Sequence, residues 1–62
     1  MINNANLLKK ANRAVENGEM IGYCLACGAE ADGVEPDARE YECESCGASE
    51  VYGAEELIIM LP

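Results

Sequence analysis

The sequence predicts a small α+β domain with a helix near each end and short antiparallel hairpins between them. One observation is length, because 62 residues without phenylalanine or tryptophan leave little to bury, and chains of about 60 residues hide only roughly 60% of their unfolded surface. Another is a repeated phrase in which tyrosine precedes C-x-x-C-G, as YCLACG at 23–28 and YECESCG at 41–47. The last is apolar spacing typical of helices at both ends. Such a domain needs a stabilising element besides its core, and four cysteines in two pairs point to a bound metal ion.

Residues 4–17 are predicted to form an amphipathic helix. Apolar residues recur at the i, i+1, i+4, i+7 and i+8 spacing that places side chains on one helical face, and they are Leu7, Leu8, Ala11, Ala14 and Val15. The opposite face is polar and carries Asn6, Lys9, Asn12, Arg13 and Glu16. Gly18 follows directly and suits the left-handed conformation that commonly closes a helix.

The centre of the chain is predicted to contain short extended segments. EMIGYC at 19–24 is an extended lead into the first cysteine pair. Asp32-Gly33 and Pro36-Asp37 are turn formers, and we expect two short strands around that turn. Residues 49–52 follow the second pair and are expected to form a third strand.

The apolar run after Gly53 is predicted to form a short C-terminal helix. Glu55 and Glu56 fall in its first turn, where the helix dipole favours negative charge. A buried strand is the alternative, since an Ile-Ile pair suits either structure. We expect this run, residues 57–61, to meet the apolar face of the N-terminal helix, because burying one Leu or Ile side chain yields roughly 1.5 to 3 kcal/mol. The contact is expected within one chain, with a homodimer as the alternative.

The cysteines are arranged as C-x2-C-x15-C-x2-C, a spacing typical of structural zinc sites. Two residues between ligands allow a tight turn to point both sulfurs at one ion, with backbone N–H groups directed at the thiolates. Gly28 and Gly47 supply the positive φ that lets the chain leave each turn. In a reducing compartment such pairs indicate metal rather than disulfides. We therefore predict one Zn²⁺ per chain, bound by Cys24, Cys27, Cys43 and Cys46.

This metal centre is predicted to be structural, and the protein is not expected to be an enzyme. Four thiolates leave no open coordination position, and the chain has no histidine to serve as a general base. A thioredoxin-like redox dithiol would need a larger βαβ scaffold. Iron is the alternative metal, because rubredoxins also use two C-x-x-C-G knuckles. Their usual aromatic core and knuckle proline are missing here, which makes an iron electron carrier the weaker interpretation.

Between Tyr23 and Gly53 the chain resembles the zinc ribbon family, through YCLACG, PDAREYECESCG and VYGAEEL. More narrowly, it looks like the small zinc-ribbon proteins encoded by bacteriophages and prophages. The resemblance implies two zinc knuckles on β-hairpins and no enzymatic activity. We accordingly divide the chain into residues 1–19, an amphipathic helix packed on the ribbon, and residues 20–62, the four-cysteine ribbon with its apolar C-terminal segment.

Charge is expected to decide which partners the protein binds. Twelve acidic and four basic residues give a formal net charge of −8, and the basic residues before the first cysteine are Lys9, Lys10 and Arg13. Four thiolates around a divalent ion would add a further charge of about −2. Many zinc ribbons linked to transcription touch nucleic acid through basic or aromatic residues, whereas this ribbon is acidic. We therefore expect a protein partner, with nucleic-acid binding through the basic helix as the alternative.

The sequence is expected to belong to a soluble cytoplasmic protein without membrane association. No apolar run approaches the roughly 20 residues that span a bilayer. The start, MINNANLLKK, lacks the basic opening and long apolar stretch of a secretion signal. A monomer is favoured over a homodimer.

Overall fold

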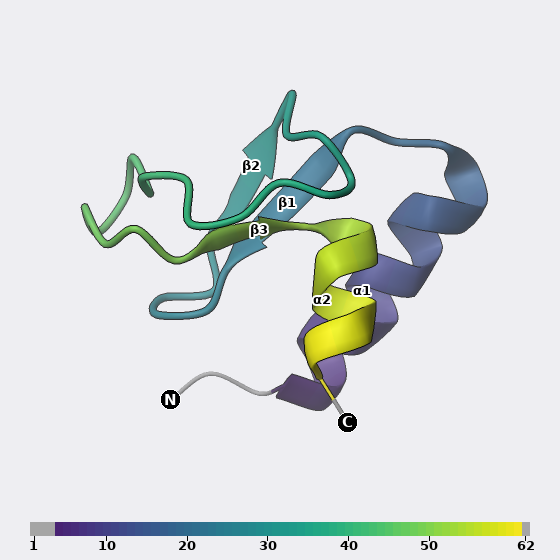
Figure 1. Ribbon diagram of the computed structural model, residues 1–62. Coiled ribbons are helices and arrows are strands. Elements are labelled where there is room, and N and C mark those ends of the chain that lie inside the picture. The colour runs from purple at the N-terminus through teal and green to yellow at the C-terminus, as the bar shows by residue number, and fades with distance from the viewer. Residues whose placement is uncertain (1–3, 62) are drawn as a thin grey trace.

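Two helices lie side by side next to a small antiparallel sheet in the computed structural model, which describes residues 4–61 (Figure 1). The elements follow in the order α1 (Asn4–Asn17), β1 (Ile21–Cys24), β2 (Glu30–Asp32), β3 (Val51–Gly53) and α2 (Ala54–Met60). The predicted α+β class with a helix near each end is confirmed. Residues 1–3 and 62, which belong to the two predicted units, lie outside the described residues.

Helix α1 occupies the predicted residues and buries part of the predicted face. Leu7 is 3% exposed and Ala11 and Ala14 are similarly buried, whereas Val15 is 40% exposed. Val15 was expected on the buried face, but α1 has 14 residues and α2 only seven, so the last turn of α1 has no helix opposite it. The helix ends as expected at Gly18 (φ 69°). The Glu19 N–H donates to the Ala14 carbonyl oxygen, and the Gly18 N–H to that of Val15, which is the Schellman arrangement.

The sheet has the order β2-β1-β3, with both neighbours antiparallel to β1. The turn that contains the first cysteine pair connects β1 to β2, and the register of these two strands places Tyr23 opposite Glu30. On its other side β1 meets β3, with Gly22 opposite Gly53. The lead at 19–24 is therefore not merely extended, because its last four residues form the central strand.

The strand expected after the Asp32-Gly33 turn is not formed. Residues 33–40 instead follow a path of turns, and only Tyr41 makes an isolated bridge, to Val51. Pro36 has no N–H for a ladder, and the backbone carbonyls of this loop are already occupied. The Pro36 carbonyl accepts from the Glu56 N–H at 3.1 Å, and the Ala38 carbonyl from the Gly53 N–H at 3.0 Å. The carbonyl groups of the loop therefore bind amides at the junction of β3 and α2, and the loop does not add a strand to the sheet.

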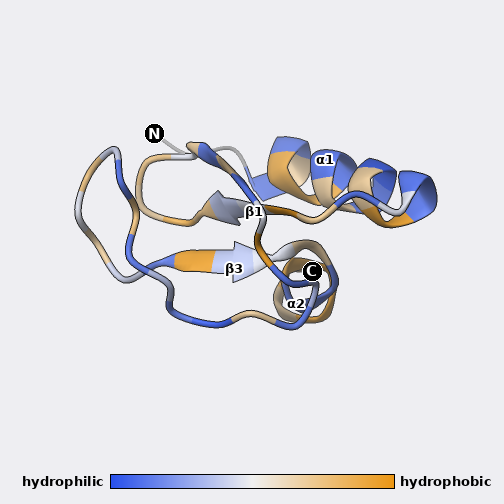
Figure 2. Ribbon diagram, turned by 90° about the horizontal axis from the view of Figure 1, so that it is seen from above, coloured by the Kyte–Doolittle hydropathy of each residue, from blue (hydrophilic) through white to orange (hydrophobic). Residues whose placement is uncertain are grey.

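The apolar residues of the two ends meet within the chain, as predicted, and the C-terminal segment is a helix rather than a strand. Leu57 is fully buried in a cluster made by Leu7, Ala11, Ala14, Tyr23, Ala54 and Leu57. Figure 2 shows the hydrophobic side of α1 facing α2 and its hydrophilic side facing outward. The far side of α2 remains open, since Ile59 is 76% exposed. Among residues 4–61, no helix has the length and apolar character required to cross a membrane.

A second, smaller cluster lies around the cysteines. Its buried members are Cys24, Val34, Ala38, Cys43 and Val51. These are small side chains that bury little apolar surface. The stability of this half of the domain therefore depends on a link between its two cysteine turns. The fold thus has a helical core at one end and a cysteine cluster at the other.

Candidate metal centre

The first cysteine turn grows directly out of β1. Cys24 is the last residue of the strand, and the chain reverses through residues 25–27 before returning as β2. The Gly28 N–H donates to the Cys24 carbonyl oxygen at 2.8 Å, and the Cys24 N–H to the Ala29 carbonyl oxygen at 2.9 Å. Gly28 has a φ of 81°, as its place in the repeated phrase predicts. The hairpin β1-β2 thereby presents both sulfurs of this turn on one side.

The second turn repeats this geometry, but only an isolated bridge residue, Tyr41, precedes it in place of a strand. The Gly47 N–H donates to the Cys43 carbonyl oxygen at 2.8 Å, and the Cys43 N–H to the Ala48 carbonyl oxygen at 2.8 Å. Gly47 has a φ of 80°. Tyr41 and Val51 exchange both backbone hydrogen bonds at 3.0 Å, which holds the two limbs of this turn together. Equal sequence phrases thus produce equal backbone turns.

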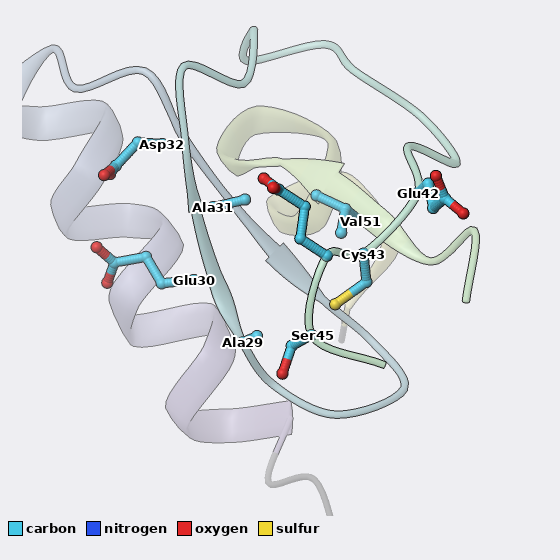
Figure 3. Close-up of a pocket in the computed structure, with 9 residues that line it drawn as sticks. Ala29, Glu30, Ala31, Asp32, Glu42, Cys43, Ser45 and Val51 are labelled. Atoms are coloured by element: carbon cyan, nitrogen blue, oxygen red, sulfur yellow. The ribbon is translucent and has the colours of Figure 1, made fainter. Parts of the chain in front are cut away.

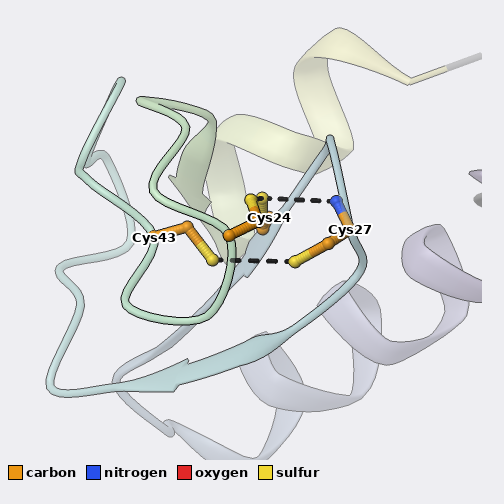
Figure 4. A group of neighbouring side chains, drawn as sticks. Cys24, Cys27 and Cys43 are labelled. Carbon is orange, nitrogen blue, oxygen red and sulfur yellow. Dashed lines mark hydrogen bonds between the residues drawn. The ribbon is translucent and has the colours of Figure 1, made fainter.

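The four predicted ligands converge. The sulfur atoms of Cys24, Cys27, Cys43 and Cys46 all lie within 4.8 Å of one another. Across the two turns, the Sγ–Sγ distance is 3.7 Å between Cys24 and Cys46 and 3.6 Å between Cys27 and Cys43; Figure 4 shows the second of these contacts. Ligands about 2.3 Å from a tetrahedral metal ion lie about 3.8 Å apart, so these residues fit such an ion. The donor set consists of sulfur alone and fills four positions.

The centre has a buried side and an exposed side. Cys24 and Cys43, the first cysteines of the two turns, are 0% and 3% exposed, whereas Cys27 and Cys46 are exposed residues. The N–H groups of Ala26 and Cys27 approach the Cys24 sulfur at 3.3 and 3.4 Å. Such N–H groups disperse thiolate charge where water cannot. The buried Cys24 sulfur is therefore stabilised by the backbone where solvent does not reach it.

The thiols of Cys43 and Cys27 differ in acidity. The backbone N–H of Cys46, followed by that of Ser45, lowers the pKa of Cys43 from 9.0 to about 7. The Ala29 N–H lowers the pKa of Cys27, but desolvation and hydrogen bonds to the other cysteines outweigh it and raise this pKa to about 12. Metal binding must therefore displace protons, and more readily from Cys43 than from Cys27.

A hollow of about 320 Å³ lies beside the centre, between β2 and the second turn. Ala29, Ala31 and Val51 contribute its apolar lining. Figure 3 shows Ala31 directed toward Val51, with the carboxylates of Glu30 and Asp32 on the side near α1 and that of Glu42 on the opposite side. These three carboxylates do not converge on one point. The convergent chemistry of this region is therefore the sulfur cluster.

Sequence reasoning missed the contacts that connect the centre to the remainder of the fold. The Leu25 N–H donates to the Glu50 carbonyl oxygen at 2.9 Å and links the first turn to the approach of β3. A backbone contact of this kind leaves no signal in residue types.

Comparison of the chain with known protein families, curated proteins and solved structures finds no match. The geometry of the cysteines is therefore the feature from which a function can be inferred.

Proposed function

We propose that the protein is a non-enzymatic, zinc-stabilised module of the zinc-ribbon type that binds another protein. The observation that carries the proposal is the convergence of four cysteine sulfurs within 4.8 Å. Four thiolates saturate a tetrahedral ion, which is the arrangement of structural rather than catalytic zinc. In a chain with so small a core, metal binding supplies folding free energy directly.

Zinc is proposed over iron on the surroundings of the sulfurs. The buried neighbours of the cysteines are Val34, Ala38 and Val51, so the cluster lacks the aromatic packing of the rubredoxins. One divalent ion per chain is the expected stoichiometry, held in a reducing compartment such as the cytoplasm where thiols stay free.

A protein partner is proposed because of the charge distribution. The chain carries a net charge of −8, and the exposed residues of the cysteine region include Glu30, Asp32, Glu42 and Glu44. Such a surface repels phosphate and attracts basic protein surfaces. We therefore expect this face to bind a basic protein surface and not nucleic acid.

A second candidate, nucleic-acid binding, is favoured by one feature of α1. Lys9, Lys10 and Arg13, together with Asn6, line a shallow hollow of about 210 Å³ on its outer face. None of the three cations makes an ion pair with another residue in the range 4–61. They would provide at most three phosphate contacts, which supports only weak, salt-sensitive binding.

Two measurements test these proposals. Metal analysis of protein purified without added metal should give one equivalent of zinc, and less than half an equivalent or a majority of iron would refute the zinc centre.

The nucleic-acid alternative is tested by affinity capture from the native host, with and without nuclease, using the wild type and a Lys9→Glu/Lys10→Glu/Arg13→Glu variant. A partner that survives nuclease and charge reversal supports the protein-binding module. Loss under both conditions supports nucleic acid.

A further inference from the structure

Helix α2 is too short to be stable alone. It has seven residues, and the residue at its N-cap position, Gly53, provides no side-chain cap. Isolated helices shorter than about 12 to 15 residues are marginal in water. Its position must therefore be set by contacts with other segments, and those contacts come from two directions.

One direction is the loop between the two cysteine turns. The carbonyl oxygens of Pro36 and Ala38 accept from N–H groups of Glu56 and Gly53 at 3.1 and 3.0 Å. The Arg39 guanidinium lies 2.7 Å from the carboxylate of Glu56, whose side chain is only 10% exposed. The amide of Gly53 just before α2, and the amide and the buried carboxylate of Glu56 in its first turn, are thus all bound by residues 36–39.

The same loop lies in a segment that is bounded by two of the proposed metal ligands. It belongs to the segment between Cys27 and Cys43, whose sulfurs lie 3.6 Å apart. An ion bound by both sulfurs would hold the ends of this segment together, in addition to the backbone bridge between Tyr41 and Val51. It would therefore restrict how far the loop can move from the helix. The other direction of contact is α1, where Leu57 is fully buried beside Leu7 and Ala11.

We propose that the loop 36–39 couples metal binding to the docking of α2 on α1. The docked helix favours the loop position that brings the cysteines together, and the bound ion favours the loop position that caps the helix. Loss of the ion releases α2 and uncovers the apolar side chains beneath it, including Leu7 and Tyr23. The inference rests on the metal centre proposed above. It adds that the occupancy of this centre is communicated to the opposite end of the molecule.

Thermodynamic reciprocity provides the test: if the bound ion favours docking of α2 by some factor, the docked helix favours ion binding by the same factor. A change that weakens docking should therefore also weaken metal binding. Zinc affinity is measured by competition with a colorimetric chelator for two matched pairs. Leu57→Ala, in the docked face, should bind zinc at least about fivefold more weakly, and Ile59→Ala, on the exposed side of the same helix, should differ by less than about twofold. Arg39→Ala should weaken zinc binding roughly threefold, and Arg13→Ala should not.

A fifth variant separates coupling through the loop from a general loss of stability. Gly18→Ala strains a residue at φ 69° with no atom within 4 Å of the added carbon, so it destabilises the fold without touching α2 or the loop. It should lower the melting temperature, but for a given drop in melting temperature it should weaken zinc binding less than Arg39→Ala does. In the wild type, chelation of zinc should accelerate hydrogen exchange of the α2 amides. The α1 amides should begin to exchange faster only after those of α2.

The outcomes are distinct. Equal zinc affinities for Leu57→Ala, Arg39→Ala and their controls would overturn the coupling, and so would a loss in Gly18→Ala that is as large, relative to the drop in melting temperature, as that in Arg39→Ala. Equal protection of the α2 amides with and without zinc would also overturn it. If Leu57→Ala does not fold, the Arg39→Ala and Arg13→Ala pair decides the question alone. A wild type that binds no zinc would instead refute the proposed function.

Discussion

Replacing Gly53 by alanine should destabilise the protein although the backbone there suits any residue. Gly53 has φ −67° and ψ 161°, a conformation that alanine adopts without strain. In such a position Gly→Ala usually stabilises by about 0.4 to 1 kcal/mol, through the unfolded chain. The added carbon, however, would lie 2.5 Å from the Pro36 carbonyl carbon and closer still to the carbonyl oxygens of Glu35 and Pro36. These are backbone atoms, which cannot rotate out of the way.

The steric cost decides the sign. Overpacking of this kind costs about 1 to 3 kcal/mol, and displacing the loop also weakens the bond from the Gly53 N–H to Ala38, which contributes about 1 kcal/mol. The net loss is then about 2 kcal/mol, which lowers the melting temperature of a domain this size by roughly 8 to 16 °C. Thermal unfolding of the zinc-loaded protein, followed by circular dichroism, measures it. Gly18→Asn is the control, because asparagine tolerates positive φ. An unchanged or raised melting temperature for Gly53→Ala would refute the close approach of loop and helix.

Three further predictions concern the metal centre and the charged surface. Cys43→Ser should abolish stoichiometric zinc and unfold the ribbon of residues 20–62, since zinc binding in small domains supplies about 10 to 16 kcal/mol; wild-type protection of the ribbon amides without metal would contradict it. Zinc affinity should fall by at least about a thousandfold from pH 8 to pH 6, because protons compete for the thiolates. The pKa of Cys43 near 7 means that its proton competes only below that pH, whereas Cys27, with its pKa near 12, must release a proton throughout. Chelator competition at both pH values measures this, and a pH-independent affinity would exclude thiolate ligation. Binding to duplex or single-stranded DNA should be weaker than micromolar at about 0.15 M salt, where the Debye length is about 8 Å; a submicromolar dissociation constant by fluorescence anisotropy would overturn this expectation.

The sequence predicted those parts of the fold whose information is local. Leu7, Ala11 and Ala14 recur with helical spacing and Gly18 ends the helix, so α1 was predictable from its own residues. The cysteine cluster was predictable for the same reason, because each C-x-x-C-G phrase encodes its own turn. Val15 satisfied the same spacing and is nevertheless exposed, since burial depends on the length of the opposing helix. Periodicity reports a face but not what lies across from it.

The path of residues 33–41 could not be predicted from the sequence. Turn residues there suggested a hairpin, but the carbonyl groups of Pro36 and Ala38 bind the N-terminus of α2 instead. This contact joins backbone atoms of segments far apart in the chain, so residue types carry no sign of it. The C-terminal run was ambiguous for a related reason, because Ile58 and Ile59 suit helix and strand equally. The loop carbonyls that cap α2 resolve this ambiguity.

The position of β2 at the edge of the sheet bears on how the protein behaves when concentrated. An unpaired strand edge is a template on which a second chain can extend the sheet. β2 has only three residues, and its first and last are the exposed Glu30 and Asp32, so a second copy aligned there would bring carboxylates against carboxylates. The other edge, β3, is already met by Tyr41. The acidic composition that disfavours phosphate thus also opposes edge-to-edge aggregation, and amide replacements at Glu30 and Asp32 would remove that protection while leaving the cysteines untouched.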